Sequence, residues 1–369
     1  MLDSTTYVGV DNLLQDFRGR TDSGYPGING GAIRFQPDDI LIGNIRPYLK
    51  KVWLADRVGG ASPDVLTVSS QPQWRELVMP RFMFYALASD GFIDYMMKHA
   101  KGGKMPRGDK SALLSYRIPV PPLEVQREIV RILDTFSELE AELEAELEAR
   151  RVQYAYYRDS LLDFGESDRA KITPLGEVGL FIRGRRFTKD DMTDVGIPCI
   201  HYGEIYTHYG TATDTALSHV RPEIAGQLRF AEPGDVVVAA VGETIEDVAK
   251  AVAWMGEERV AIHDDTFLFR SELNAKYVAY VMQTAAFHDQ KRRYVASAKV
   301  KRLSGEDLAR ITIPVPPAEE QQRIVAVLDL FESLIGNLAG GLPAELRDRR
   351  QQYVYYRDRL LTFNERSGE

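Results

Sequence analysis

The chain has 369 residues, of which 44% are hydrophobic and 27% are charged, and its formal net charge at pH 7 is −8. This length accommodates two ordinary domains, and the apolar content supports buried cores, which excludes a chain that is disordered throughout. The longest apolar runs are strand-sized, no charged segment leads into an apolar core near residue 1, and Cys199 is the single cysteine. We therefore expect a cytoplasmic protein with no membrane span, secretory signal, internal disulfide or cysteine-built zinc site.

The negative charge is unevenly distributed along the chain. Residues 1–117 carry 15 basic and 12 acidic side chains, whereas residues 123–164 carry 5 basic and 11 acidic ones. The net charge of the whole chain therefore does not indicate what its separate segments bind.

Residues 1–117 have the pattern of a mixed α/β domain. The turn-forming residues Gln36 to Asp39 lead into the apolar run Ile40-Leu41-Ile42, and Asp64 precedes the run Val65-Leu66-Thr67-Val68. A turn that enters an apolar run predicts a buried strand, and the aromatic-rich residues 85–97 predict a helix. We call this first globular segment head one.

A proline-rich lead-in and a long amphipathic run occupy residues 118–164. Pro119, Pro121 and Pro122 cannot lie in a helix interior, so this stretch is expected to be extended and the helix to begin after it. Apolar residues then recur at alternating steps of three and four, which marks a narrow stripe along one helix face. If residues 123–164 form one helix, it is about 60 Å long.

Residues 165–312, which we call head two, repeat the skeleton of head one. The turn Glu232-Pro233-Gly234-Asp235 enters the run Val236-Val237-Val238, and Asp264-Asp265 precede Thr266-Phe267-Leu268-Phe269. Residues 277–287 are again aromatic-rich. The sequence therefore predicts the same mixed α/β domain, used twice.

Residues 313–369 repeat the lead-in and the amphipathic run. Ile118-Pro119-Val120-Pro121-Pro122 returns 195 residues later as Ile313-Pro314-Val315-Pro316-Pro317, but the closing motif at Tyr154 returns 199 residues later at Tyr353. The four residues gained between them are about one helical turn, so the stripe returns to nearly the same face. A kink or break is expected around Gly340-Gly341-Leu342-Pro343.

Two matching stripes predict that the two helices pair as an antiparallel coiled coil. The alternative is that each helix packs only on its own head, but 42 residues exceed what one small domain can cover. The predicted fold class is therefore α+β: two mixed α/β domains joined by two long helices, with pseudo-twofold symmetry. The residues predicted to pair the helices are Ile129, Phe136, Leu143, Leu147, Tyr157, Ile324, Phe331, Leu338 and Tyr356.

Each head contains a basic cluster just before its proline lead-in, with Lys104 and Lys299 separated by the same 195 residues. Cations hold DNA phosphates and arginine reads base edges, although a solvated surface is the commoner explanation of any single cluster. The equivalent placement in both heads favours binding. The cluster of head two also contains Lys291 and Arg293, and the residues predicted to contact DNA are Arg46, Lys50, Lys101, Lys104, Arg107, Lys110, Arg183, Arg185, Arg186, Arg292, Lys299, Lys301 and Arg302.

The chain lacks the motifs of the enzymes that act on DNA. No G-x-G-x-x-G or G-x-x-x-x-G-K-[ST] run is present, and the two Pro-Pro pairs are followed by Leu123 and Ala318 rather than by an aromatic residue. His263-Asp264-Asp265 could suggest a metal nuclease, but the parallel Asp64 favours a turn before a strand. We predict no catalytic residue and no metal ligand.

The doubled Ile-Pro-Val-Pro-Pro lead-ins, with Gln126 and Gln321 beyond them, and the loop Gly102–Lys110 resemble the specificity subunits of type I restriction–modification systems. The resemblance covers nearly the whole chain. It implies that each head is a target recognition domain for one half of a bipartite DNA sequence, and that the coiled coil sets the spacing and docks two methyltransferase subunits. It also implies that restriction subunits can join, and that S-adenosylmethionine and ATP are bound by those partners and not by this chain.

One departure from this family concerns the start of head one. Head two opens with Ile172-Thr173-Pro174-Leu175-Gly176-Glu177-Val178, but Tyr7–Leu13 of head one aligns with the region around Cys199–Ile205, so about 27 residues have no counterpart. Either the chain continues upstream of residue 1 or head one is trimmed. Two other functions stay open: a coiled-coil adaptor whose heads bind proteins, and a stand-alone metal-dependent nuclease.

Overall fold

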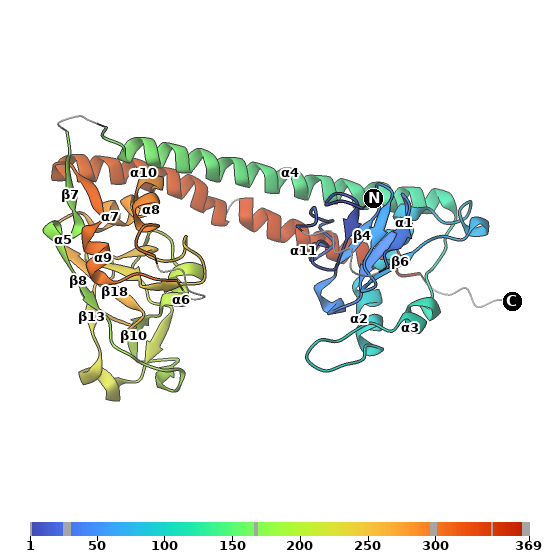
Figure 1. Cartoon of the computed structure of the whole chain (residues 1–369), viewed down its shortest axis with the longest axis horizontal. Coiled ribbons are helices and arrows are strands. Elements are labelled where there is room, and N and C mark those ends of the chain that lie inside the picture. Colours follow the sequence, from blue (N-terminus) through green and yellow to red (C-terminus); the bar gives the residue numbers. More distant parts are fainter. Residues whose placement is uncertain (1, 25–30, 166–168, 296–300, 341, 364–369) are drawn as a thin grey trace. The chain divides into compact units, whose positions relative to one another are not determined.

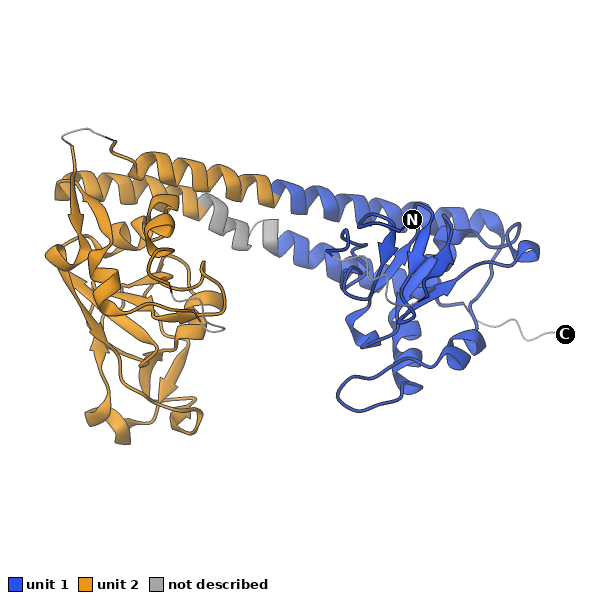
Figure 2. Cartoon of the chain, viewed as in Figure 1, with its two compact units in different colours: residues 1–146, 342–369 blue, residues 147–341 orange. Residues whose placement is uncertain are grey.

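The computed structural model describes residues 2–24, 31–165, 169–295, 301–340 and 342–363, with no side-chain description for residues 334–343. The chain divides into two compact units, of which unit 1 comprises residues 1–146 with 342–369 and unit 2 comprises residues 147–341 (Figure 2). Each unit contains one head and a part of both long helical segments. Among the described residues, no helix is both long and apolar enough to cross a membrane.

Unit 1 contains two three-stranded sheets, each with a buried central strand. In the first, β3 lies between β4 and β6 and pairs antiparallel with both; in the second, β5 lies between β1 and β2. The strands are β1 (Tyr7–Val8), β2 (Ile33–Phe35), β3 (Ile40–Gly43), β4 (Val52–Leu54), β5 (Gly59–Ala61) and β6 (Val65–Val68). The helices of the head are η1 (Pro47–Leu49), η2 (Pro72–Trp74), α1 (Pro80–Leu87), α2 (Asp90–Lys98) and α3 (Lys110–Ser115).

Unit 2 is built on two five-stranded sheets. Their strand orders are β11-β16-β14-β18-β8 and β13-β17-β10-β12-β9, and two further pairs are β15-β19 and β20-β7. The strands are β7 (Lys171–Pro174), β8 (Gly179–Arg183), β9 (Met192–Thr193), β10 (Ile197–Ile200), β11 (Ala212–Thr213), β12 (Ser218–Val220), β13 (Phe230–Ala231), β14 (Val236–Ala239), β15 (Val241–Gly242), β16 (Ala251–Trp254), β17 (Val260–Ile262), β18 (Thr266–Ser271), β19 (Lys301–Arg302) and β20 (Thr312–Val315). The helices of the head are α5 (Leu175–Val178), η3 (Lys189–Asp191), α6 (Tyr202–Thr207), η4 (Pro222–Gln227), α7 (Ala275–Val281), α8 (Ala285–Lys291) and α9 (Gly305–Arg310).

The long helices are α4 (Leu123–Leu162), α10 (Ala318–Gly340) and α11 (Leu342–Leu361) (Figure 1). Both α4 and α10 begin directly after the proline clusters, as the sequence predicts. α10 ends at Gly340 and α11 begins at Leu342, and the break predicted around Gly340-Gly341-Leu342-Pro343 stays a prediction, because Gly341 lies outside the described residues.

The two heads share one skeleton, which confirms the predicted repeat. The central strands β3 and β14 are entirely buried, and each is entered by the same turn: Asp39 accepts the backbone N–H of Gln36 at 2.8 Å, and Asp235 accepts that of Glu232 at 2.8 Å. β6 corresponds to β18, because each pairs antiparallel with the central strand of its head. β1 corresponds to β10, since Tyr7 and Cys199 begin equivalent parallel pairings with β5 and β17.

Each long helix starts on its own head through a buried glutamine. The amide of Gln126 accepts the N–H of Met79 at 2.9 Å and donates to the carbonyls of Leu77 and Pro121 at 2.8 and 2.7 Å. The amide of Gln321, 195 residues later, accepts the N–H of Asn274 and donates to the carbonyl of Pro316, both at 2.9 Å. A buried amide that satisfies backbone groups fixes the angle between lead-in and helix.

A second pair of equivalent contacts lies about two turns further along each helix. The hydroxyl of Tyr85 hydrogen-bonds Asp134, and that of Tyr280 hydrogen-bonds Asp329 at 2.8 Å. Burial raises the pKa of both tyrosines above its ordinary value, and the hydrogen bond to the carboxylate adds to the rise for Tyr85. The two helix starts are thus held by the same contacts.

The helices also pair with each other, antiparallel, inside each unit. In unit 1 Phe136 of α4 stacks on Tyr356 of α11 with ring centroids 5.7 Å apart; in unit 2 Phe331 of α10 stacks on Tyr157 of α4 at 5.5 Å. Arg350 of α11 adds an ion pair to Glu140 at 2.6 Å and a second to Glu144. In each unit a phenylalanine of one helical segment thus stacks on a tyrosine of the other, which is the contact pattern that pseudo-twofold symmetry predicts.

The other residues predicted to pair the helices include some that pack into the core of a head. Ile129 and Ile324 are buried in the cores of head one and head two, Leu147 is buried and Leu143 is half-buried, while Leu338 lies outside the described side chains. The far ends of the helices pack on the opposite heads, because Tyr353 and Leu360 of α11 reach the core of head one and Leu161 and Leu162 of α4 reach that of head two. The alternative in which each helix packs only on its own head is therefore wrong.

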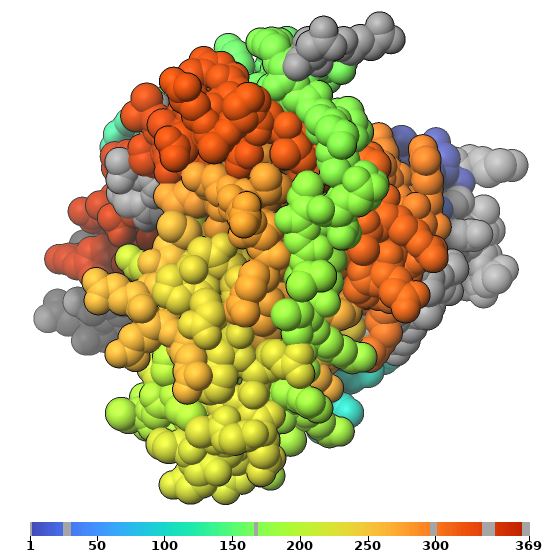
Figure 3. All heavy atoms as spheres, turned by 90° about the vertical axis from the view of Figure 1, so that its left-hand side faces the viewer, coloured from blue at the N-terminus to red at the C-terminus, as the bar shows by residue number. Residues whose placement is uncertain are grey.

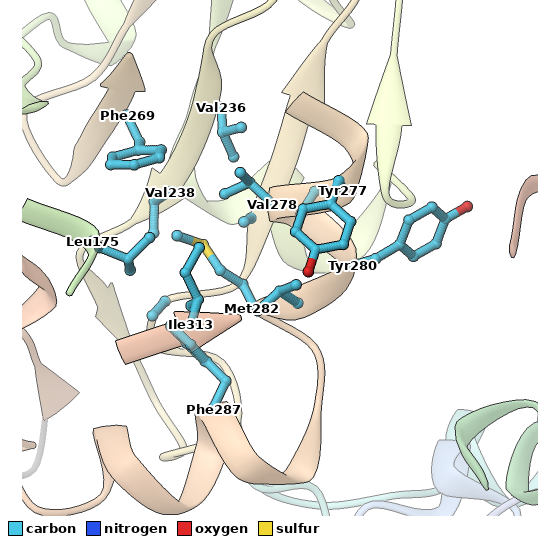
Figure 4. Close-up of a cluster of buried hydrophobic side chains, with 14 of the residues drawn as sticks. Leu175, Val236, Val238, Phe269, Tyr277, Val278, Tyr280, Met282, Phe287 and Ile313 are labelled. Atoms are coloured by element: carbon cyan, nitrogen blue, oxygen red, sulfur yellow. The ribbon is translucent and has the colours of Figure 1, made fainter. Parts of the chain in front are cut away.

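The largest core lies in unit 2, between the β14–β18 strands and helices α7 and α8 (Figure 4). Val236, Val238 and Phe269 of the sheet face Val278 and Tyr277 of α7. Ile313 of the lead-in joins this core, since β20 pairs antiparallel with β7. The lead-in is thus extended, as predicted, and lies against head two.

Candidate nucleic-acid interface

The basic loop of head one is a narrow hairpin. The backbone N–H groups of Lys101 and Arg107 donate to each other's carbonyls at 2.9 and 2.8 Å, and Gly102 has a φ of 97°, which favours glycine. The Lys101 ammonium lies 2.6 Å from Asp109, and this hydrogen bond lowers the pKa of the Asp109 carboxyl. Lys104 is exposed at the tip and has no ion-pair partner among the described residues. The hairpin therefore presents at least one free cation to solvent.

Arg107 joins this hairpin to the end of the central strand of head one. It bridges Ile45, and the next residue, Gly108, donates its N–H to the carbonyl of Asn44 at 3.0 Å. The guanidinium lies 3.0 Å from Asp64, which precedes β6, and remains 60% exposed. The aspartate orients the guanidinium and leaves most of its donors available.

Head two places Arg302 in the same position. Arg302 pairs with Val241 at the end of the central strand, and Leu303 donates its N–H to the carbonyl of Ala240 at 3.0 Å. The guanidinium lies 3.8 Å from Asp265, which precedes β18, and is 61% exposed. Lys301 is half-buried in the same strand, whereas Lys299 lies outside the described residues.

A cavity in head two brings three of the predicted arginines together. Arg183, Arg186 and Arg302 line it, with Lys189, His201 and His263. Arg183 also donates from Nε to the carbonyl of Asp264 at 2.8 Å. Burial and then the neighbouring His263 lower the pKa of His201, so its imidazole is neutral near pH 7. Asp264 and Asp265 also line the cavity, and Asp265 lies 3.8 Å from Arg302, so part of its positive charge is already balanced by carboxylates.

Arg185 lies in the segment that follows β8, between the cavity residues Arg183 and Arg186. Its backbone N–H donates to the carbonyl of Ile262 at 3.1 Å, and its side chain is exposed. The backbone bond fixes the position of this cation on the surface of head two.

The corresponding cavity of head one is lined by Arg46, Lys51 and Asp64, together with Asp11 and Asn12. Arg46 has a positive φ of 54°, and its buried Nε has no hydrogen-bond partner among the described residues. A strained residue with an unsatisfied donor is typical of a functional position.

Three predicted contact residues have other neighbours. Lys50 lies 2.7 Å from Asp90, which also pairs with Arg357 of α11, so its ammonium faces the helices. Lys110 is the exposed first residue of α3, and Arg292 forms an ion pair with Asp289 at 3.1 Å. Their participation in DNA binding stays a prediction.

Lys291 does not belong to the exposed basic cluster of head two. Its side chain is fully buried, and Nζ donates to the carbonyls of Val248 and Glu246 at 2.6 and 3.0 Å. Burial lowers its pKa to about 8. The sequence carried a signal for this position, because Lys291 follows the buried Phe287 by four residues and so shares its helix face.

His263, Asp264 and Asp265 place possible metal ligand atoms within 4.8 Å of one another. These groups already have protein partners: Nε2 of His263 lies 3.1 Å from the carbonyl of Phe187 and 3.2 Å from Asp264, and Asp265 faces Arg302. The arrangement matches Asp64 with Arg107 in head one, which supports the turn before a strand that the sequence favours.

The partners that orient the two arginines were not predicted from the sequence. Asp64 and Asp265 were identified only as turn residues. The available signal was the pairing of an aspartate before one strand with an arginine before the lead-in, at equivalent places in both heads. The long sequence separation within each pair conceals this contact.

Comparison with known proteins shows the family to which the chain belongs. Residues 31–149 and 169–348 match the family model of the type I restriction modification DNA specificity domain. The chain is 31% identical over 307 residues to a type I restriction enzyme specificity subunit of Haemophilus influenzae, covering 79% of this chain and 74% of that protein. It is 30% identical over 273 residues to the EcoR124I/EcoR124II specificity subunit of Escherichia coli, covering 67% of this chain and 63% of that protein.

A solved chain from the type I R-M system has the same fold. It superimposes with a TM-score of 0.62 at 19% sequence identity, covering 98% of this chain and 92% of that chain. The matched family regions include residues 31–117 of head one, residues 169–312 of head two and most of the long helices, which agrees with the predicted resemblance. The chain therefore belongs to the family of type I restriction–modification DNA specificity subunits.

Proposed function

We propose that each head of this DNA specificity subunit binds one half of a bipartite target, with Arg107 and Arg302 as equivalent contacts. The supporting observation is their matched surroundings: each follows a basic loop, bridges the end of a central strand and lies beside the aspartate that precedes the neighbouring strand. A guanidinium held in this way can exchange its aspartate for a phosphate or a guanine edge without losing its direction. Membership in the family gives no support to the protein-binding adaptor or the stand-alone nuclease.

The salt dependence of DNA binding tests these contacts. Fluorescence anisotropy with mixed duplexes at several salt concentrations should give a smaller slope of log Kd against log salt for Arg107→Ala and for Arg302→Ala. Each lost phosphate contact removes about 0.9 from the slope on B-DNA. Arg131→Ala and Arg323→Ala are matched controls, because both arginines are exposed on the long helices and each forms an ion pair with the glutamate three residues before it.

Two other outcomes are informative. If Arg107 or Arg302 reads a base, the substitution should weaken binding to one duplex sequence while the salt slope on mixed duplexes stays unchanged. If neither the slope nor the sequence preference changes, these arginines do not belong to the interface.

In this proposal the chain supplies the DNA sequence specificity of a larger assembly. Two methyltransferase subunits supply S-adenosylmethionine-dependent chemistry, restriction subunits supply ATP-dependent steps where the system includes them, and the assembly works in the cytoplasm. Support for non-catalytic action comes from the sequence, which lacks nucleotide-binding and methyltransferase motifs. Co-purification of tagged chain with methyltransferase subunits, followed by mass measurement, tests the stoichiometry.

The long helices set the distance between the half-sites in this proposal. With 40 residues, α4 has a length of about 60 Å, and half-sites on one face of B-DNA lie about 34 Å apart per helical turn. Inserting one turn into both helical segments should lengthen the tolerated gap and leave both half-sites unchanged. Altered half-sites with an unchanged gap would contradict this role.

A further inference from the structure

In head two the central strand leads into a loop of residues 243–248. β14 lies inside its sheet, between β16 and β18, and the sheet ends at β8, which belongs to the green band of residues 171–183 in Figure 3. Beyond β14 the chain forms β15, in which Gly242 lies opposite Lys301, one residue before Arg302. The loop that follows therefore begins beside the cations of β19.

A buried lysine of α8 holds this loop in place. Nζ of Lys291 donates to the carbonyls of Glu246 and Val248 at 3.0 and 2.6 Å, and the side chain is fully buried. Burying an ammonium costs folding free energy, and the two carbonyls compensate for that cost only while the loop keeps them near Nζ. The loop is also closed against its own start, because a Cβ at Gly242 would lie 2.7 Å from the Cβ of Asp247. These contacts fix the position of the loop on head two.

The loop is longer in head two than in head one. Asn44 and Ala240 are equivalent, because each donates its N–H to the carbonyl of the aspartate before the neighbouring strand, at 2.9 and 2.8 Å. Lys50 and Ala249 are equivalent as well, since both have a positive φ two residues before the next strand. Between these two positions head one has five residues and head two has eight. The strands on either side therefore correspond, whereas the loop between them does not.

Head one has a methionine at the position of Lys291. The helices α2 and α8 are equivalent, since both begin after a hydroxyl cap, Ser89 and Thr284, with an offset of 195 residues. Met96 lies 195 residues before Lys291 and is 1% exposed. A methionine thus fills this position without burying a charge. The lysine is therefore explained by the loop that it holds and not by the packing of the helix.

The loop also brings a free carboxylate to a basic surface. Glu243 is exposed and has no hydrogen-bond or ion-pair partner among the described residues, whereas Glu246 lies 3.9 Å from Arg292. DNA phosphates repel a carboxylate, so its favourable contact with a duplex is an amino group on a base edge, such as cytosine presents in the major groove. A carboxylate at this place is suited to reading a base and not to holding a phosphate.

We propose that the loop of residues 243–248 contacts base edges in the half-site of head two through Glu243, and that Lys291 is the positioning residue that holds the loop there. This role rests on the proposed DNA binding by head two, and it assigns an exocyclic amino group of a base as the donor to the Glu243 carboxylate. A segment that specifies one of two different half-sites is expected to differ between the heads while its supporting strands stay alike, as this loop does.

Selection of bound duplexes from a random-sequence library identifies the bases that the full chain prefers, and repeating the selection with variants tests the loop. Glu243→Ala should lower the preference for one base in one half-site by about tenfold, because a contact to its amino group is lost. Binding to mixed duplexes should stay at least as tight, since a charge that repels phosphates is removed. Arg302→Ala is instead expected to weaken the binding of mixed duplexes if its contact is a phosphate.

The positioning role predicts that Lys291 acts only through the loop. Lys291→Met, which introduces the residue type of head one, should lower the preference for the same base by a similar factor. The double variant with Glu243→Ala should lower it no further, because the two changes remove one contact. Lys276→Met is the matched control, since the Lys276 ammonium pairs with Asp329 of α10 at 2.8 Å, and it should leave the preference unchanged.

Hydrogen exchange shows whether the Lys291→Met chain is folded and whether its loop has moved. The amide of Lys250, which donates to the carbonyl of Asp247 at 3.0 Å, should exchange faster, whereas that of Val237 inside the sheet should stay protected. Unchanged exchange at Lys250 would overturn the role of Lys291. Loss of protection at Val237 as well would show that the lysine stabilises the whole sheet, which also overturns a positioning role.

The base contact and the proposed role of Arg302 can fail separately. An unchanged base preference in Glu243→Ala, with an altered salt slope or preference in Arg302→Ala, would overturn the contact of the loop and leave the arginine. A changed preference in Glu243→Ala with no effect of Arg302→Ala would support the loop and remove the arginine from the interface.

Discussion

Replacing the two buried glutamines separately should destabilise the two helix starts by different amounts. Gln126 makes three hydrogen bonds to backbone groups, whereas Gln321 makes two. The Gln126 side chain is fully buried and that of Gln321 is 4% exposed, so no water replaces the lost amide. We consider Gln126→Met and Gln321→Met, because methionine keeps the volume and removes the hydrogen bonds.

The expected magnitudes follow from the numbers of bonds. A buried backbone group that loses its partner costs about 1 kcal/mol or more, so Gln126→Met should lower the free energy of unfolding by about 3 kcal/mol and Gln321→Met by about 2 kcal/mol. With a urea m-value of about 2 kcal/mol/M, the midpoints should fall by about 1.5 M and about 1 M. The difference between the variants is the more reliable figure, since packing changes are alike in both.

Hydrogen exchange of two amides distinguishes this explanation from general loosening. Gln126→Met should speed exchange at Met79 and leave Asn274 protected, while Gln321→Met should do the reverse, because each glutamine oxygen accepts from only one of these amides. Equal destabilisation by both variants, or faster exchange at both amides in either one, would show that the glutamines do not anchor the helices independently.

Three further predictions concern the helix pairing and two buried groups. Arg350→Ala should cost only about 0.5 kcal/mol of stability, less at high salt, because its ion pairs to Glu140 and Glu144 are partly exposed; urea unfolding at two salt concentrations measures this. Burial and then the nearby Lys291 lower the pKa of His288 from 6.5 to about 4, so its contribution to stability is present above pH 6.5 and is lost as the pH falls toward 4. A His288→Gln chain should show a shallower loss over that range, and an identical pH profile would contradict it. Burial raises the pKa of Cys199 to about 12, so a thiol reagent at pH 8 should label the native chain far more slowly than the unfolded chain.

The long helices and the repeated skeleton could be predicted because local patterns determine them. The proline clusters fix where α4 and α10 begin, and the stripe of apolar residues marks which face is covered. The turns at Asp39 and Asp235 precede buried strands for the same local reason, since each carboxylate caps its own turn. The sequence did not predict which apolar residues of a long helix contact a head and which contact the other helix. Ile129 and Phe136 belong to the same apolar stripe, but Ile129 packs in head one and Phe136 stacks on α11.

The side-chain partners at the candidate interface could not be predicted from the sequence, for a different reason. Arg107 and Asp64 lie 43 residues apart, and their contact depends on the hairpin that folds back against Ile45. Lys291 looked like one more surface cation, although its spacing from Phe287 indicated the buried face of α8. Charge clusters are visible in sequence, but which of their members face solvent is decided by packing.

The two offsets in the repeat have a structural meaning. Contacts that tie a helix start to its own head recur at 195 residues, as in Gln126 with Gln321, and so do Phe136 and Phe331, whereas the tyrosines on which these two rings stack, Tyr356 and Tyr157, are 199 residues apart. The extra four residues of the second helical segment therefore fall between Phe331 and Tyr353. Length can therefore change there without altering how either head is held, which makes the helical segment an adjustable part and the heads fixed ones. A distance between half-sites could vary by this route while the residues that contact each half-site stay the same.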